Sequence, residues 1–247
     1  MKYLYVCNWK MFVNHRLIDS FLKAYAVEVT GISEYGEVVI CPPFSFFDYA
    51  NTQKKIGGIN TLKLGAQDCS QFTYGAYTGE IAASYLKEAG CQYCIVGHAE
   101  RRNLFYEDDR VVLTKTKNLL TNGITPIICI GSIKGELSMV DECTYIMKQI
   151  DFFMRNLDVN SNLIFAYEPH QAIGGGTMPT IDSIKEIFLA IKKSICNFLF
   201  EKNPLIMYGG SVDENSIQIL KKIDEIDGFL IGRASIDFQK LKNIISY

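Results

Sequence analysis

Residues 163–176 read Leu-Ile-Phe-Ala-Tyr-Glu-Pro-His-Gln-Ala-Ile-Gly-Gly-Gly, and this stretch shows the unit from which the chain is built. Its first five residues form an apolar run that ends at Tyr167, and the carboxylate of Glu168 comes directly after it. Pro169 then breaks the run, and a glycine-rich segment leads to the next region of helical periodicity. The pattern predicts a buried strand, an acidic side chain at its tip and a flexible loop beyond it.

Seven further apolar runs occur along the chain, and helix-period segments separate most of them. With the run above, the expected strands are 4–9, 38–41, 59–66, 93–97, 124–130, 163–167, 205–208 and 228–231. These runs are continuous rather than alternating, which is typical of parallel strands buried on both faces. Four longer amphipathic segments are expected to be helices: 18–29, 111–120, 140–157 and 181–200.

Strand–helix alternation repeated eight times within 247 residues predicts an α/β protein with a (β/α)₈ barrel. The doubly wound open sheet is the structural alternative. Its glycine fingerprint would come after the first strand, where this chain has Asn8-Trp9-Lys10 instead. No linker, low-complexity tract or block of like charge interrupts the alternation, so residues 1–247 are expected to form one domain.

The composition argues against several classes of partner. Hydrophobic residues make up 48% of the chain and charged residues 21%, which is an ordinary globular balance. A net charge of −2 lacks the basic footprint of proteins that bind nucleic acid or anionic membranes. No run approaches the roughly 18 apolar residues of a membrane span, and no secretory signal is expected at the start. We therefore expect a cytoplasmic protein with no nucleic-acid or membrane partner.

Eight cysteines lie mostly inside apolar runs, as Cys7, Cys41 and Cys129 do. Cys91 and Cys94 form a C-x-x-C pattern, which is also found in zinc sites and redox pairs. There is no second cysteine pair or histidine cluster at metal spacing. Free buried thiols in a reducing compartment are therefore the favoured interpretation, and no metal is expected.

Polar residues and glycines fall where the predicted strands end. In chain order they are Lys10, His98, Glu168, Gly209-Gly210-Ser211 and Gly232-Arg233. Taken singly, each has an ordinary explanation, such as a rim charge, a loop histidine or a tight turn. In a closed barrel, however, the carboxyl ends of all strands converge on one mouth, where the chemistry of this fold takes place. The sequence therefore predicts one site for proton transfer beside a carbonyl.

The glycines after the seventh and eighth runs suggest what the site binds. Backbone amides without a side chain in the way can point at a phosphate group, and a short helix after the eighth strand would add its positive end. The Gly174-Gly175-Gly176 run does not indicate dinucleotide binding, because it comes after a sixth strand and lacks the G-x-G-x-x-G spacing. The expected substrate is a small phosphorylated sugar.

Several motifs in a fixed order carry a resemblance to a known family. They are Asn8-Trp9-Lys10-Met11, Gly65-Ala66-Gln67, residues 75–80 (Gly-Ala-Tyr-Thr-Gly-Glu), residues 96–102 (Val-Gly-His-Ala-Glu-Arg-Arg), Cys129-Ile130-Gly131, Tyr167-Glu168-Pro169, Ala172-Ile173-Gly174, residues 208–212 (Tyr-Gly-Gly-Ser-Val) and residues 227–232 (Asp-Gly-Phe-Leu-Ile-Gly). Along nearly its whole length the chain resembles the triosephosphate isomerase family of TIM barrels. The resemblance implies interconversion of D-glyceraldehyde 3-phosphate and dihydroxyacetone phosphate through an enediol(ate), with no metal or organic cofactor.

The resemblance also implies roles for individual residues. Glu168 would be the base that moves a proton between neighbouring carbons, and neutral His98 would polarise the carbonyl and shuttle protons between oxygens. Lys10 would stabilise the enediolate, Asn8 would orient Lys10 and the substrate oxygen, and Glu100 would partner Lys10. The phosphate would be held by backbone amides of Gly174, Ser211, Gly232 and Arg233. Residues 169–179 would close over the site as a lid.

The family is usually a homodimer, and the resemblance places the contact on the loop after the third strand. Residues 75–80 match the loop that reaches into the neighbouring subunit's site, with Thr78 at its tip. Arg101 would be the partner of Glu80 or of the loop backbone. The alternative is that residues 75–80 form an ordinary surface loop.

The sequence departs from the family pattern at several positions. Ala99 stands where serine is usual, His170-Gln171 comes after Pro169 where the lid usually carries a tryptophan, and Arg233 replaces a common second glycine. These changes leave two alternatives open. One is a paralogous isomerase that acts on a four-carbon ketose phosphate with the same Lys/His/Glu mechanism. The other is a phosphate-binding barrel that has lost catalysis.

Overall fold

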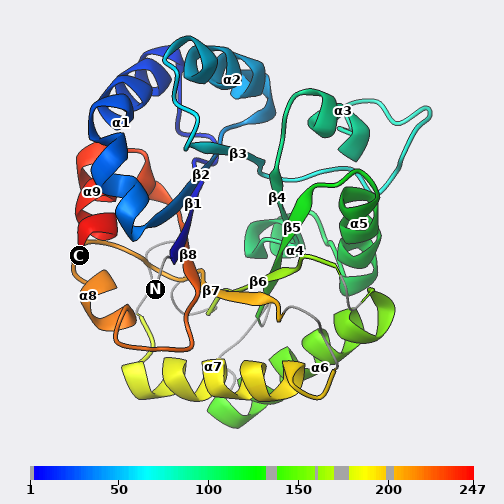
Figure 1. The fold of residues 1–247 in the computed structure, drawn as a ribbon. Helices are drawn as coiled ribbons and strands as arrows, with labels where there is room; N and C mark the ends of the chain where they lie inside the picture. Colours follow the sequence, from blue (N-terminus) through cyan, green and yellow to red (C-terminus); the bar gives the residue numbers. More distant parts are fainter. Residues whose placement is uncertain (1–2, 132–137, 159–160, 170–177, 199–202) are drawn as a thin grey trace.

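The computed structural model describes residues 3–131, 138–158, 161–169, 178–198 and 203–247 of the chain. The strands within these ranges are all parallel and close into a barrel in sequence order, with β8 pairing back onto β1. Figure 1 shows the strands at the centre and the helices around them. The predicted (β/α)₈ fold is confirmed.

The observed strands match the predicted apolar runs closely. They are β1 (Tyr3–Asn8), β2 (Gly36–Cys41), β3 (Lys63–Ala66), β4 (Tyr93–Val96), β5 (Thr125–Ile130), β6 (Ile164–Tyr167), β7 (Leu205–Tyr208) and β8 (Gly228–Ile231). The register brings the polar strand ends into line: Asn8 pairs with Cys41, and Tyr167 pairs with both Ile130 and Tyr208.

Helices cover the outside of the barrel. They are α1 (His15–Tyr35), α2 (Phe47–Ile56), α3 (Ala83–Glu88), α4 (Ala99–Leu104), α5 (Asp109–Thr121), α6 (Met139–Asn156), α7 (Ile181–Ile195), α8 (Ile217–Leu220) and α9 (Phe238–Ser246), with short 3₁₀ turns η1 (Phe44–Phe46) and η3 (Arg233–Ser235). Several helices begin at an N-cap residue whose side chain accepts a hydrogen bond from a backbone N–H of the first turn. Ser, Thr, Asp and Asn are the residues preferred at this position, and here they are Asn14, Asp108, Ser138, Thr180 and Asp237.

The continuous apolar runs are explained by two separate cores. Leu4 and Val6 of β1 belong to a small cluster that fills the barrel interior. Tyr5 and Cys7, which alternate with them, belong to the larger cluster between strands and helices. Both faces of each strand are therefore buried, and a strand of this kind has no polar face to show in its sequence.

Several elements differ in length from the prediction, among them α7, which ends at Ile195 and not at 200, and packing accounts for two of the differences. The first helix was expected over 18–29 but α1 extends past Gly31 to Tyr35, because Ile32 beyond the glycine is buried in the core. The third strand was expected over 59–66 but β3 begins at Lys63. Ile59 is buried too, yet its amide donates to the carbonyl of Lys54 and so closes the end of α2.

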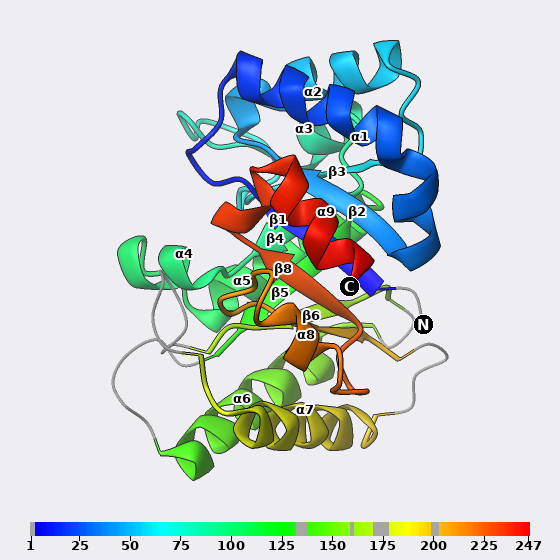
Figure 2. The same cartoon turned by 90° about the vertical axis from the view of Figure 1, so that its left-hand side faces the viewer.

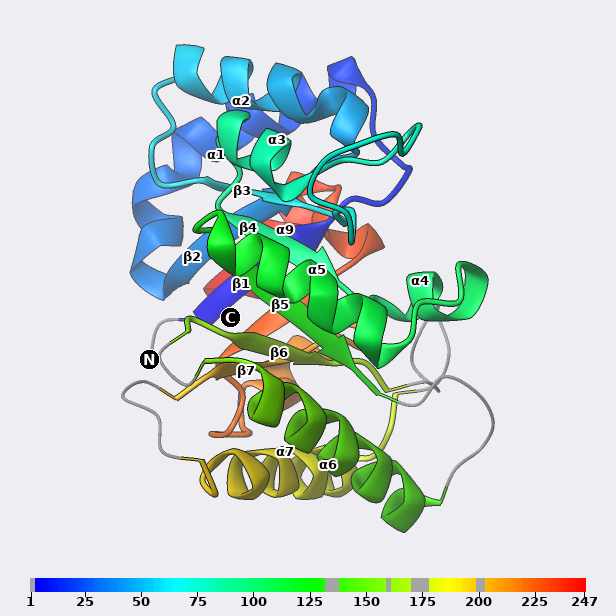
Figure 3. The same cartoon turned by 90° about the vertical axis from the view of Figure 1, so that its right-hand side faces the viewer.

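The two ends of the barrel differ in their loops. Figures 2 and 3 show α4 and the loop between β3 and α3 standing beyond the sheet on the same side, which is where the strands end. Within the described ranges, none of the helices has the length and apolarity needed to cross a bilayer. The end of the barrel with these longer loops also carries the polar residues predicted for the site.

Candidate active site

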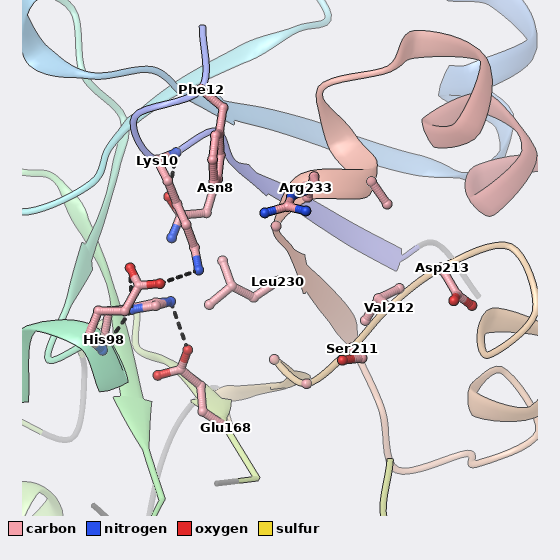
Figure 4. A pocket seen from close by; sticks show the side chains of 15 residues that line it. Asn8, Lys10, Phe12, His98, Glu168, Ser211, Val212, Asp213, Leu230 and Arg233 are labelled. Atoms are coloured by element: carbon pink, nitrogen blue, oxygen red, sulfur yellow. Dashed lines mark hydrogen bonds and ion pairs between the residues drawn. The ribbon is translucent and has the colours of Figure 1, made fainter. Parts of the chain in front are cut away.

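A pocket of about 370 Å³ opens at the carboxyl ends of the strands (Figure 4). It brings together most residues predicted for the site, from β1, β4, β6, β7 and β8: Asn8, Lys10, His98, Glu100, Glu168, Ser211, Gly232 and Arg233. Gly174 and most of the predicted lid lie outside the described residues. Phe12, Val212, Asp213 and Leu230 also line the pocket and were not predicted.

Lys10 lies just beyond β1 and is fixed at both its backbone and its ammonium group. Its φ is +48°, a left-handed conformation that is unusual outside glycine. The backbone N–H of Lys10 donates to Oδ1 of Asn8 at 3.2 Å, and its carbonyl accepts from Nε2 of Gln67 at 3.0 Å. The Nζ atom lies 2.6 Å from Oε1 of Glu100. Asn8, Glu100 and Gln67 thus hold Lys10 in the pocket, and the sequence patterns did not predict a role for Gln67.

His98 lies just beyond β4 and begins helix α4. Its Nδ1 accepts a hydrogen bond from the backbone N–H of Glu100 at 3.2 Å. A nitrogen that accepts such a bond carries no proton, so this contact favours the neutral imidazole with its proton on Nε2. The Glu100 carboxylate lies 3.6 Å from Nδ1, which is too long for a hydrogen bond. The proton-bearing Nε2 therefore faces the pocket as a donor.

Glu168 lies at the end of β6 and turns toward His98. Its Oε1 lies 3.0 Å from Nε2 of His98, and its Oε2 accepts from the backbone N–H of Ala99 at 2.8 Å. The side chain is 4% exposed. At position 99, where the family usually has a serine, the contact with the carboxylate comes from the backbone, which the alanine keeps.

Residues at the end of β5 lie close to Glu168. Gly131 has φ +146°, and a Cβ there would lie 2.3 Å from the carbonyl oxygen of Glu168. Burial, with Glu168 close by, raises the pKa of the Cys129 thiol well above its usual range, so this thiol stays neutral. Nε of Arg102 donates to the carbonyl of Gly97 at 2.8 Å and an NH₂ group donates to that of Cys129 at 3.1 Å, which joins the ends of β4 and β5.

The glycine-rich ends of β7 and β8 form the opposite side of the pocket. A Cβ at Gly210 would lie 2.3 Å from the Tyr208 hydroxyl, so a larger residue there would require the Tyr208 ring to shift. The Ser216 hydroxyl donates to the carbonyl of Ser211 at 3.1 Å. Gly232 faces the catalytic side, since a Cβ there would be 4.0 Å from Cε of Lys10. Gly209, Gly210, Ser211 and Gly232 all line the pocket.

The predicted dimer residues lie beside this pocket. Thr78 and Glu80 are exposed on the loop between β3 and α3. Within the chain, the Nε atom of Arg101 forms ion pairs with Asp68 at 2.8 Å and with Glu107 at 2.7 Å. Burial raises the pKa of Asp68 to about 6 despite its ion pairs with Lys115 and Arg101. A second cavity of about 480 Å³ has both Glu80 and Arg101 in its wall.

The arrangement suits proton transfer assisted by charge. It joins a carboxylate base, a neutral imidazole donor and an ammonium group within one small pocket. Among the described residues, no group of three or more His, Cys, Asp or Glu side chains is placed to hold a metal ion. General acid–base catalysis with electrostatic stabilisation needs only the groups that are present.

Comparison with known proteins points to one family. The family model described as "Triosephosphate isomerase" matches residues 3–247. Proteins named triosephosphate isomerase are similar over almost their full length. The one from Ehrlichia chaffeensis is 35% identical over 99% of this chain and 96% of its own. That from Endomicrobium trichonymphae is 37% identical over 97% and 96%, and that from Aquifex aeolicus is 36% identical over 99% of both chains.

Proposed function

The chain belongs to the triosephosphate isomerase family, and on this premise we propose that it interconverts D-glyceraldehyde 3-phosphate and dihydroxyacetone phosphate. One observation carries the assignment of residues: Lys10, His98 and Glu168 come from three different strand ends and converge in one pocket. There the Lys10 ammonium contacts the Glu100 carboxylate at 2.6 Å, and the His98 imidazole contacts the Glu168 carboxylate at 3.0 Å.

The first step is removal of a proton from carbon. In dihydroxyacetone phosphate, the Glu168 carboxylate takes a proton from C1, the C–H bonding pair becomes the C1–C2 double bond, and negative charge passes to the C2 oxygen. Glu168 is buried and lines the pocket, so the base is held beside the substrate.

The second step moves protons between oxygens. Nε2 of His98 donates its proton to the C2 oxygen, and the C1 hydroxyl proton replaces it on the imidazole. The protonated Glu168 then delivers its proton to C2, the C1=O bond forms, and the product is glyceraldehyde 3-phosphate. Nδ1 is kept as an acceptor by the Glu100 amide, so the imidazole enters the cycle neutral.

Lys10 stabilises the charge that develops between these steps. Its ammonium group is fixed before substrate binds, by Glu100 at Nζ and by Asn8 and Gln67 at the backbone. Donors that are already oriented toward a developing oxyanion lower the barrier without reorganisation. Asn8 also lines the pocket and would orient the substrate oxygen.

Catalysis requires Glu168 to exchange its contacts in this structure. Nε2 of His98 carries a single proton in the neutral ring and donates it in a hydrogen bond to Oε1 of Glu168 at 3.0 Å. A substrate carbonyl therefore has to replace Oε1 of Glu168 at this nitrogen. Once Oε2 also leaves the backbone amide of Ala99, the carboxylate can turn to the substrate carbon, with residues 169–179 closing over the pocket as a lid.

The phosphate group of the substrate would bind to backbone amides of Gly174, Ser211, Gly232 and Arg233. The described part of the pocket supports this. Gly210 and Gly232, which follow β7 and β8, line the pocket and have no side chain between their backbone and a ligand. Charge-assisted bonds from backbone amides are strong enough to select a phosphate dianion.

The protein would act as a homodimer in the cytoplasm, with residues 1–247 as one isomerase domain. Large apolar side chains that line the cavity with Glu80 and Arg101 are exposed in the single chain: Met11 at 93%, Leu104 at 67% and Phe105 at 61%. A partner's loop around Thr78 would cover them.

All eight cysteines are free, and this supports a reducing compartment.

Steady-state isomerisation of glyceraldehyde 3-phosphate by the purified protein tests the proposal. Rapid turnover, with kcat/KM at least roughly tenfold above that for a four-carbon ketose phosphate, is expected, because one extra carbon changes this ratio in a fitted pocket. Preference for the four-carbon substrate, or no turnover with either, would contradict the proposal.

Sedimentation equilibrium should give twice the chain mass of 27.9 kDa. A fully active monomer would contradict the dimer.

A further inference from the structure

Arg233 places a charged side chain on the rim of the pocket. It is the first residue of η3 and comes directly after Gly232 at the end of β8. Both Arg233 and Phe12 line the pocket, although they come from opposite ends of the chain. The guanidinium carbon lies 5.1 Å from the centroid of the Phe12 ring, and Figure 4 shows the two side chains next to each other above Leu230.

The other charged groups of the pocket are already engaged. The Lys10 ammonium is paired with Glu100, and Glu168 is bound to His98 and to the Ala99 amide. Oδ1 of Asp213 accepts the backbone amides of Asn215 and Ser216. Within the described residues, no ion pair of Arg233 is found.

The contact with Phe12 orients Arg233 without neutralising it. A guanidinium that lies near an aromatic face is attracted by the ring quadrupole, while its N–H groups remain able to donate in the guanidinium plane. Arginine stays protonated in proteins, and its planar fork matches two oxygens of a phosphate group. An exposed, oriented and unpaired guanidinium beside the backbone amides at the end of β8 is therefore suited to a phosphate dianion.

We propose that the Arg233 side chain, positioned by the Phe12 ring, binds the phosphate group of the substrate in addition to the backbone amides. This inference rests on the proposed function for the identity of the substrate. Arg233 is then a binding residue, and Phe12 acts through it as a positioning residue. The guanidinium also gives the pocket mouth a positive charge that attracts the anionic substrate from solution.

The test uses the full-length protein and two probes. The first is inorganic phosphate, with its dissociation constant measured by calorimetry. The second is glyceraldehyde 3-phosphate, with kcat and KM measured at several salt concentrations. The variants are Arg233→Ala, Arg233→Lys, Phe12→Leu and the double variant. Arg155→Ala is the matched control, because Arg155 forms an exposed ion pair with Asp151 on α6, away from the pocket.

Arg233→Ala is expected to weaken phosphate binding about 10–100-fold, as loss of a charge-assisted hydrogen bond does. KM should rise by a similar factor, kcat should change less than about threefold, and the salt dependence of kcat/KM should become shallower. Arg233→Lys should restore part of the binding, since it keeps charge but not the fork. Phe12→Leu should weaken binding severalfold in the wild-type background and have no further effect with Arg233→Ala. Arg155→Ala should change neither probe.

Unchanged phosphate binding and KM in Arg233→Ala would overturn the proposal. An equal effect of Phe12→Leu with and without Arg233 would overturn the positioning role. If the alanine variant does not fold, Arg233→Gln removes the charge while keeping a polar side chain of similar reach. Should the wild type bind phosphate through Arg233 and yet show no isomerase turnover, the proposed function fails while the assignment of Arg233 stands.

Discussion

Nε2 of His98 lies 3.0 Å from Oε1 of Glu168, so the proposed electrophile and the proposed base hold each other. The two residues lie at the ends of β4 and β6, which are separated in the barrel by β5. The backbone around them is tied across that gap: the Glu168 amide donates to the carbonyl of Ile130 at 2.8 Å. Each group keeps the other in one orientation, and a substrate carbonyl has only one contact to displace.

Replacement of His98 by glutamine should therefore remove catalysis rather than the fold. A glutamine amide can donate to Glu168 but cannot exchange a proton with the substrate oxygens. We expect kcat to fall about 10²–10⁴-fold, the usual contribution of a positioned acid–base group. His15→Gln is the matched control, since His15 is exposed at the start of α1. Steady-state kinetics would contradict the assignment of His98 if both variants kept wild-type kcat.

Gly131 sets the position of Glu168 by close approach. Alanine at this position would bring Cβ to 2.3 Å from the Glu168 carbonyl oxygen, in a backbone with φ +146°. We expect Gly131→Ala to lower the free energy of unfolding by more than about 2 kcal/mol and to lower kcat as well, because the carboxylate shifts.

Gly31→Ala is the control for this substitution. Gly31 lies within α1 with no atom within 4 Å of an added Cβ, so alanine should raise stability by about 0.5–1 kcal/mol. Urea denaturation measures both variants. A Gly131→Ala protein as stable as wild type would show that Glu168 is not held by this contact.

Sequence patterns predicted the strands well because each strand has both faces buried. Leu4 and Tyr5 face different cores, and both positions must be apolar whatever their neighbours are. The same pattern overextended β3, because Ile59 is buried in the core while its backbone closes the end of α2 and does not join the sheet. It also ended α1 near Gly31, where tertiary packing of Ile32 outweighs the low helix propensity of glycine.

Sequence patterns predicted which side chains gather in the pocket but not the backbone contacts that hold those side chains. Lys10, His98 and Glu168 mark strand ends and could be found from position alone. The amide of Ala99 that binds Glu168, and the Gln67 amide that holds Lys10, depend on how loops approach each other in space. The identity of a side chain does not predict a bond made by its backbone, so the alanine at 99 gave no indication of the contact between its amide and Glu168.

Cysteine reactivity should depend on burial. Cys196 is exposed, while Cys7, Cys91 and Cys129 are among the buried thiols. Burial raises the pKa of Cys7 and of Cys91 to about 12, so few thiolates form at about pH 8. Iodoacetamide should label Cys196 rapidly in the folded protein, and the buried positions only after urea is added, as measured by peptide mass spectrometry. Rapid labelling of Cys129 in the folded protein would show that the base of the pocket opens to solvent.

Asp213 should make stability pH-dependent in the acid range. Hydrogen bonds from the backbone amides of Ser216 and Asn215 lower the pKa of this carboxyl below its usual value. The folded state therefore binds the proton less readily than the unfolded chain, whose aspartates titrate near about 3.9, and the stabilisation is lost as pH falls through the folded pKa. Wild type should be more stable than Asp213→Ala by about 1 kcal/mol at pH 7 in urea denaturation, a modest value for a mostly exposed group, and the gap should narrow toward that of Asp213→Asn as pH falls below about 3.9. The Asp213→Asn side chain can accept hydrogen bonds from the same two amides but does not titrate, so the difference in stability between it and Asp213→Ala should not change with pH. If the difference between wild type and Asp213→Ala is equally constant, the carboxylate is not the cause.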